Sequence, residues 1–355
     1  MLSLPDKESY YDFYEKQNLV NGYYRLVCHF VPFLTFPVYL EAFYCVFCKS
    51  KQFDPKYAVL LRIHMFLNLI GELHQTVLFL PNIILPGFCV SAEGLLSLLK
   101  VSPSWQFFAM SAIFQMSSAT MVHLFLCRMK QTVPLGLKHW KFVRLSADLL
   151  TVFFYFTAFV SLLAFCLLDE DQIVAKRRME KNFLVAPPNL WAPNFITSGP
   201  ENPHFETYLN IICVELIIFS LNVIIVPAVS FSFLSKIPAG KSNKHTHANR
   251  KTLRMLMFQL ATHLFFYILP TMCFALDAVL QANNIAVLSF GLFVFSLHGI
   301  ACTMTLILAN KPFRSTTRTH LCTVFCCSRP SKDIAHSHVG SGTDLRLIPK
   351  ITAVF

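Results

Sequence analysis

Acidic, amide and histidine side chains recur inside long apolar stretches of this 355-residue sequence. In one stretch, His64, Asn68, Glu72 and Gln75 fall within one sector of a helix at about 100° per residue. Polar groups are costly in lipid, so this stripe must face other helices or internal water. We interpret His64 and Asn68 as part of an intramembrane packing network, to which Gln259 of a later stretch is also assigned.

Further polar side chains are spread over stretches rich in phenylalanine and leucine. A few convergent polar groups on an apolar wall are typical of a small-molecule pocket. Glu72 fits this pocket and the packing network equally well. For His298, the neighbouring Gly299 favours a role in helix packing over a role in the pocket. The predicted ligand-binding residues are Glu72, Gln115, Glu215, Asp277 and His298.

Catalytic and metal-binding patterns do not accompany these residues. We find no nucleophile paired with a base and no HExxH zinc motif. The twelve cysteines are scattered without metal-ligand spacing, and Cys45 and Cys48 form a CxxC outside any redox-fold pattern. The sequence therefore predicts neither an enzyme nor a cofactor or metal site.

The composition of the chain indicates the environment in which these side chains lie. The chain is 55% hydrophobic and only 14% charged, whereas soluble domains are about one quarter charged. We conclude that this is a membrane protein. Its net charge of +11 fits basic cytoplasmic loops that face anionic lipid better than it fits a nucleic-acid partner.

Seven stretches are long and apolar enough to cross a bilayer, which takes about 20 residues. The fold class is therefore an all-α integral membrane protein, with a seven-helix bundle over 24–310. The second stretch differs from the others because four ionisable residues fall inside it, and two prolines predict a kink in the first. The stretches are 24–48, 57–80, 104–127, 145–168, 208–233, 255–281 and 285–310.

The distribution of lysine and arginine gives the expected orientation. With the N-terminus outside, most of these residues fall on the inner segments, as the positive-inside rule requires. Residues 1–23 then form an extracellular N-terminus. They lack the basic-then-apolar order of a cleavable signal peptide, so the first stretch is expected to serve as a signal anchor. Residues 311–355 form a cytoplasmic tail that is largely disordered.

The inner face carries a basic surface and a cysteine cluster. The arginines either anchor to lipid headgroups or bind a signalling protein. The cysteines are either palmitoylated or remain as free thiols, and the sequence favours neither. Outside, the proline-rich connection 169–207 is either a lid over the bundle or a solvated loop. The inner residues are Arg128, Arg144, Arg250 and Arg254, followed by Cys322, Cys326 and Cys327.

Three segments carry a resemblance to a known family. SLHGIACTMTLILANKPFR (296–314) resembles the last crossing of the nematode serpentine chemoreceptors of class H, with Phe313 where tyrosine is usual. LLRIHMFLNLIGELHQTVLFLPNIILPGFCVSAEGLL (60–96) is similar to their second crossing. FQLATHLFFYILP (258–270) is similar to their sixth, although Thr262 and His263 replace an expected Ile-Pro. The sister class I has a similar pattern.

The resemblance implies a seven-helix receptor for an odorant or another small environmental molecule, acting through a heterotrimeric G protein. Such receptors lie in the plasma membrane, including the sensory cilium of chemosensory neurons. The four arginines would then face the G protein. Cys127 rather than an acid precedes Arg128, so the activation mechanism of rhodopsin-like receptors does not apply to this chain.

Two other classes remain open at this point. A ligand-gated cation channel of inverted topology also has seven helices, but the strongly apolar stretch 285–310 is a poor pore lining. A transporter comes third, because no internal repeat is visible.

Overall fold

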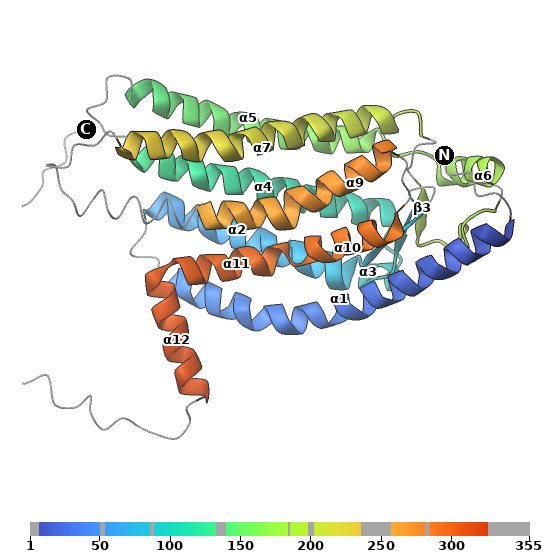
Figure 1. Ribbon diagram of the computed structural model, residues 1–355, viewed down its shortest axis with the longest axis horizontal. Coiled ribbons are helices and arrows are strands. Elements are labelled where there is room, and N and C mark those ends of the chain that lie inside the picture. Colours follow the sequence, from blue (N-terminus) through green and yellow to red (C-terminus); the bar gives the residue numbers. More distant parts are fainter. Residues whose placement is uncertain are drawn as a thin grey trace, which may run out of the picture.

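The computed structural model describes residues 7–49, 54–85, 89–132, 140–183, 185–197, 202–235, 257–280 and 284–325. Long helices run side by side along the molecule and form an all-α membrane bundle (Figure 1). In chain order these are α1 (Lys7–Lys49), α2 (Pro55–Leu73), α4 (Pro103–Thr132), α5 (Trp140–Cys166), α7 (Phe205–Ser235), α9 (Leu269–Leu280), α10 (Ile285–Ser296) and α11 (His298–Ala309).

Among the described residues, five helices are long and apolar enough to cross a membrane, or six if the bent pair α10 and α11 is one span. The helix α2 is outside that set, and it carries Arg62 and Glu72. It nevertheless contacts α1, α4 and α11. Its polar side is thus covered by other helices rather than by lipid, which is why a crossing can hold these groups.

Large apolar side chains remain exposed along the outside of the bundle. On α5 these include Phe156, Phe159 and Leu163, and on α7 they include Ile217 and Ile224. Scattered single apolar residues are normal on a soluble surface, but a whole helix face of them is not. Lipid contact accounts for these faces.

The helix α1 is longer than a bilayer requires. Its 43 residues correspond to about 65 Å at 1.5 Å per residue, against a hydrocarbon core of about 30 Å. Much of the segment expected as a separate N-terminus is therefore helical and continuous with the first crossing. Figure 1 shows α1 curving along its length, and Pro32 and Pro37 lie inside it.

The last two crossings are interrupted. The described part of the sixth crossing begins at Met257 and contains η3 (Leu264–Ile268), a π-helical turn, followed by α9. This turn precedes Pro270, because proline cannot donate to the carbonyl four residues earlier. The seventh crossing bends by 41° between α10 and α11, at Leu297. The sequence predicted a single stretch over 285–310, and the bend places His298 at the first position after the break.

A small sheet closes one end of the bundle, beyond what the sequence predicted. Its strands β1 (Pro81–Ile84), β2 (Cys89–Ala92) and β3 (Phe195–Thr197) pair antiparallel in the order β1-β2-β3. The short helices α3 (Leu95–Leu98) and α6 (Gln172–Asn182) flank it. We call the sheet together with α6 the cap. The proline-rich connection 169–207 thus supplies a helix and a strand.

The cap has its own apolar contacts with the bundle. Phe79, Val90 and Ile196 form a buried cluster with Phe107 and Met110 of α4 packed against it. The N-terminal half of α1 also reaches the cap, because Gln17 Nε2 donates to the carbonyl of Ile83 in β1 at 2.9 Å. Tyr14 Oη donates to the carbonyl of Val185, in the segment that follows α6, at 3.1 Å. These bonds hold the long helix across the end of the bundle.

The opposite end carries α12 (Lys311–Phe325), which turns away from α11 and crosses α1 (Figure 1). Glu41 of α1 accepts hydrogen bonds from Thr317 Oγ1 and His320 Nδ1, both at 2.9 Å. The first third of the tail expected to be largely disordered is therefore an ordered helix. The rest of that tail lies outside the described residues.

Candidate functional site

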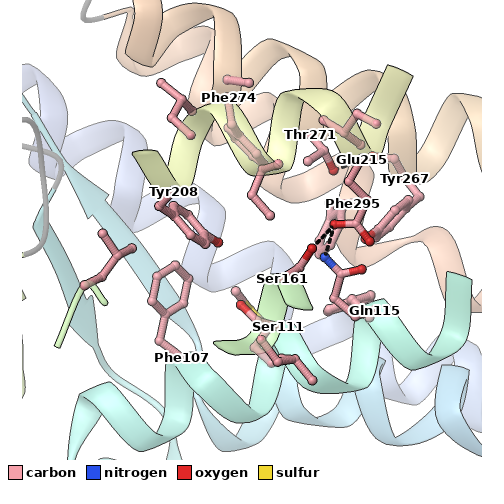
Figure 2. Close-up of a pocket in the computed structure, with 18 of the residues that line it drawn as sticks. Phe107, Ser111, Gln115, Ser161, Tyr208, Glu215, Tyr267, Thr271, Phe274 and Phe295 are labelled. Carbon is pink, nitrogen blue, oxygen red and sulfur yellow. Dashed lines mark hydrogen bonds between the residues drawn. The ribbon is translucent and has the colours of Figure 1, made fainter. Parts of the chain in front are cut away.

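A cavity of about 280 Å³ lies beneath the cap and is lined by α4, α5, α7, the sixth crossing and α10 (Figure 2). Val90 and Ile196 of the sheet close it on the cap side. Its wall is mainly phenylalanine and leucine, as expected for a small-molecule site. Its polar lining residues are Ser111, Gln115, Ser118, Ser161, Tyr208, Glu215, Tyr267 and Thr271.

Glu215 is the acidic group of this cavity. Gln115 Nε2 of α4 donates to its Oε2 at 2.9 Å, and Ser161 Oγ of α5 donates to the same oxygen, as the dashed lines in Figure 2 show. Three helices therefore meet at one carboxyl group. A carboxyl group held in an apolar wall needs such donors, because burial without them is costly.

Two of the five predicted ligand-binding residues, Gln115 and Glu215, line this cavity, and three do not. Glu72 is buried and accepts from Tyr39 Oη at 3.2 Å. Asp277 Oδ1 accepts from the backbone N–H of Asn284 at 3.1 Å, between the last two crossings.

Sequence reasoning did not single out Ser161, Tyr208 or Tyr267. Ser161 gave a weak signal, as a hydroxyl inside an apolar stretch. The two tyrosines had none, because aromatic residues in a crossing pack against other helices as readily as against a ligand.

Two of the three residues assigned to the packing network, His64 and Asn68, lie between α2 and α4. His64 Nδ1 is 3.0 Å from Thr120 Oγ1, and its Nε2 is 3.2 Å from Asn68 Nδ2. Ser117 Oγ donates to Asn68 Oδ1 at 2.6 Å. Gln259 is buried in the sixth crossing. Consecutive hydrogen bonds thus link α2 to α4 through His64, Thr120, Asn68 and Ser117.

His298 lies behind the cavity wall in a cluster of its own. Its Nε2 is 2.8 Å from His263 Nδ1 and 3.3 Å from Cys302 Sγ. The rings of Tyr267 and Phe114 contact His298 and also line the cavity. His263 stands where the sequence departs from the class H pattern and lies 35 positions before His298, so no short motif revealed the cluster.

At the α12 end of the bundle, the two described arginines of the predicted G-protein-facing set pack against aromatic rings. The Arg128 guanidinium lies 3.6 Å from the centroid of the Tyr57 ring, and Arg144 lies over Trp140 at 5.1 Å. Cys322 is exposed on α12. The expectations for Arg250, Arg254, Cys326 and Cys327 fall outside the described residues.

A helical membrane bundle that holds a capped apolar cavity has the architecture of a small-molecule receptor. The family model of the serpentine type 7TM GPCR chemoreceptor Srh matches residues 21–323, and the chain belongs to this family. This match confirms the resemblance to class H. The family consists of chemoreceptors and is not a family of enzymes. The match lends no support to the channel or transporter hypotheses. No curated protein and no solved structure matches the chain.

Proposed function

We propose that this chemoreceptor binds a small environmental molecule in the cavity beneath the cap and activates a heterotrimeric G protein. The N-terminus and the cap lie outside the cell, and α12 lies inside. The receptor acts at the plasma membrane, including the sensory cilium of chemosensory neurons. The positive-inside distribution of lysine and arginine supports this orientation.

The arrangement around Glu215 is the observation that carries the proposal. Both Gln115 and Ser161 donate to Oε2, and Oε1 accepts no hydrogen bond from the residues that the structure describes. A ligand with an apolar body and one basic or hydrogen-bond-donating group would fill the wall and pair with this second oxygen. Small amines are therefore the first ligand class to test.

Of the other predicted ligand-binding residues, Glu72, Asp277 and His298 would then act indirectly. Glu72 lies on α2 and His298 on α11, and these helices pack against α4 and α10 of the cavity wall. Asp277 accepts from the N–H of Asn284 at the start of the seventh crossing. A ligand that fits one bundle arrangement better than another shifts the population toward it. These three residues would influence that equilibrium without contacting the ligand.

The G protein would bind at the α12 end, where Arg128 and Arg144 lie. Arg250 and Arg254 are part of the same proposal on the basis of the sequence. Basic side chains at an inner surface also anchor to lipid headgroups, and both uses are compatible here. Lipidation of Cys322, Cys326 or Cys327 would hold α12 against the membrane.

The test is a G-protein reporter assay in cells that express the receptor, with a panel of small amines matched to neutral isosteres. An amine that activates the wild type should lose at least tenfold in potency on Glu215→Gln, because about 1.5 kcal/mol or more is lost with a charged hydrogen bond. Glu206→Gln, an exposed position on the same helix, should leave the potency unchanged.

Surface expression of each variant is measured alongside. Equal potency of an amine on wild type and Glu215→Gln would refute the ligand placement. Activation by neutral isosteres alone would refute the amine class.

A further inference from the structure

Three side chains that can bind a soft metal ion converge behind the cavity wall. His263 belongs to the sixth crossing, and His298 and Cys302 belong to α11. One ligand atom of each lies within 4.8 Å of the other two. Their exposed fractions are 0%, 1% and 4%, so the cluster is enclosed by protein.

The two contacts of His298 Nε2 within this cluster cannot both be ordinary hydrogen bonds at the same time. His298 Nε2 faces both His263 Nδ1 and Cys302 Sγ, yet a neutral imidazole nitrogen carries either one proton or one lone pair. If Nε2 holds the proton, it cannot accept from the thiol. If it holds the lone pair, two donors must share it. One metal ion would accept a lone pair from all three atoms at once.

The surroundings of His263 support a metal-ligand role for its Nδ1. With Nδ1 of His263 on a metal, its Nε2 carries the proton and faces Ser118 Oγ at 3.4 Å. Such a partner fixes the tautomer of a ligating histidine. Two nitrogens about 2.0 Å from one metal lie roughly 3.4 Å apart, so the imidazoles would have to separate by about 0.6 Å from their present 2.8 Å contact.

Ligand type and charge together select the metal. Two imidazoles and a thiolate suit copper(I) and zinc(II). Zinc(II) with one thiolate would leave a net positive charge inside the bundle, where an uncompensated charge is costly. Copper(I) with one thiolate is neutral. On binding, the Cys302 thiol loses its proton to water and a copper–sulfur bond forms, with no change of oxidation state.

We propose that His263, His298 and Cys302 form a copper(I) site that joins the sixth and seventh crossings beneath the ligand cavity. The site lies at the start of α11, directly after the bend at Leu297. Its copper would fix the relative position of two crossings whose helices are both interrupted at this level. This site does not depend on which ligand occupies the cavity.

The experiment uses the full-length receptor purified in detergent under anaerobic conditions, titrated with copper(I) against the chelator bicinchoninate. Cysteines that would add background binding are replaced by serine in all samples, namely Cys48, Cys166, Cys322, Cys326 and Cys327. We expect one copper per receptor, with one sulfur and two nitrogen ligands in the X-ray absorption spectrum.

The variants His263→Gln and Cys302→Ser should each weaken copper retention at least tenfold. The matched controls His123→Gln and Cys273→Ser, whose side chains belong to neither the cluster nor the cavity, should retain it. Copper should also raise the unfolding temperature of the wild type but not of the cluster variants, because a ligand that binds only the folded state stabilises it.

Several results would overturn the proposal. These are a wild type that holds no copper against the chelator, cluster variants that hold it as tightly as the wild type, or preferential retention of zinc(II). If a variant does not elute as a single folded species, the absorption spectrum of the wild type decides, and a spectrum without the sulfur ligand overturns the site.

Discussion

Gly299 shows how a single position controls the contact between three helices. A methyl group added there would lie 2.2 Å from Tyr39 Oη, 2.9 Å from Glu72 Oε2 and 3.0 Å from the Asn68 carbonyl oxygen. The backbone of α11 therefore approaches α1 and α2 only because this residue has no side chain. This accounts for the glycine that follows His298 in the motif of the last crossing.

We predict that Gly299→Ala lowers the stability of the receptor by about 1–3 kcal/mol, the usual cost of overpacking a well-packed core. Thermal unfolding of the purified protein measures it. The control is Gly22→Ala on α1, where nothing lies within 4 Å of the added methyl group. That change should be neutral or stabilising by up to about 1 kcal/mol, since alanine favours helix. Equal losses in the two variants would contradict the explanation.

A second residue-scale prediction concerns the network between α2 and α4. Ser117→Ala removes the 2.6 Å bond to Asn68 Oδ1 and should cost about 0.5–2 kcal/mol, because hydrogen bonds between membrane helices are modest. The control Thr151→Ala loses only a bond to the carbonyl of Ala147 within α5 and should cost less. Chemical denaturation in mixed micelles compares them, and a larger loss for Thr151→Ala would count against the network.

At the scale of elements, the cap depends on the close approach of Gly94 to the end of η2 (His74–Leu78). A methyl group on Gly94 would lie 2.3 Å from the Leu78 carbonyl oxygen, and backbone atoms cannot move aside as a side chain can. The glycine after the second crossing in the family motif is thus required by packing. Its φ of −81° is ordinary.

We therefore expect Gly94→Ala to loosen the cap, with faster hydrogen exchange over β2 and β3 than in the wild type. Gly291→Ala is the control, because its added methyl group meets only the Phe274 side chain at 3.1 Å, and a ring can shift. Unchanged exchange over both strands in Gly94→Ala would show that the approach is not needed for the sheet.

The attachment of α12 to α1 is a second element-scale feature. Glu41 accepts from both Thr317 and His320, and Glu41→Gln can no longer accept through two charged oxygens. We predict that a spin label on Cys322, in a background without other cysteines, becomes more mobile in Glu41→Gln. Glu15→Gln, an exposed position on the same helix, should not change it, and equal mobility in all samples would contradict a docked helix.

For the whole molecule, orientation decides whether the receptor proposal stands. Epitope tags at each end, stained in intact and then permeabilised cells, should show the N-terminus outside and the C-terminus inside. The basic inner segments support this result. The inverted pattern would end the G-protein proposal and favour a channel, which electrophysiology would then test.

The sequence alone determined the membrane class, the helical bundle and the family, because the hydrophobic effect acts on whole stretches and the motifs are local. It also singled out Gln115 and Glu215, which line the cavity, since buried polar groups in apolar crossings need partners. It did not indicate the sheet, because β2 and β3 lie about 100 residues apart and each is only three or four residues long.

Only the tertiary structure decided how polar residues of different crossings combine. Tyr39 with Glu72, and His263 with His298, are pairs between helices whose rotation and bends no single stretch reveals. The bend at Leu297 and the π-helical turn before Pro270 lie directly beside His298 and His263. Pairings of this kind depend on packing between segments far apart in the chain, so they appear only once the helices are assembled.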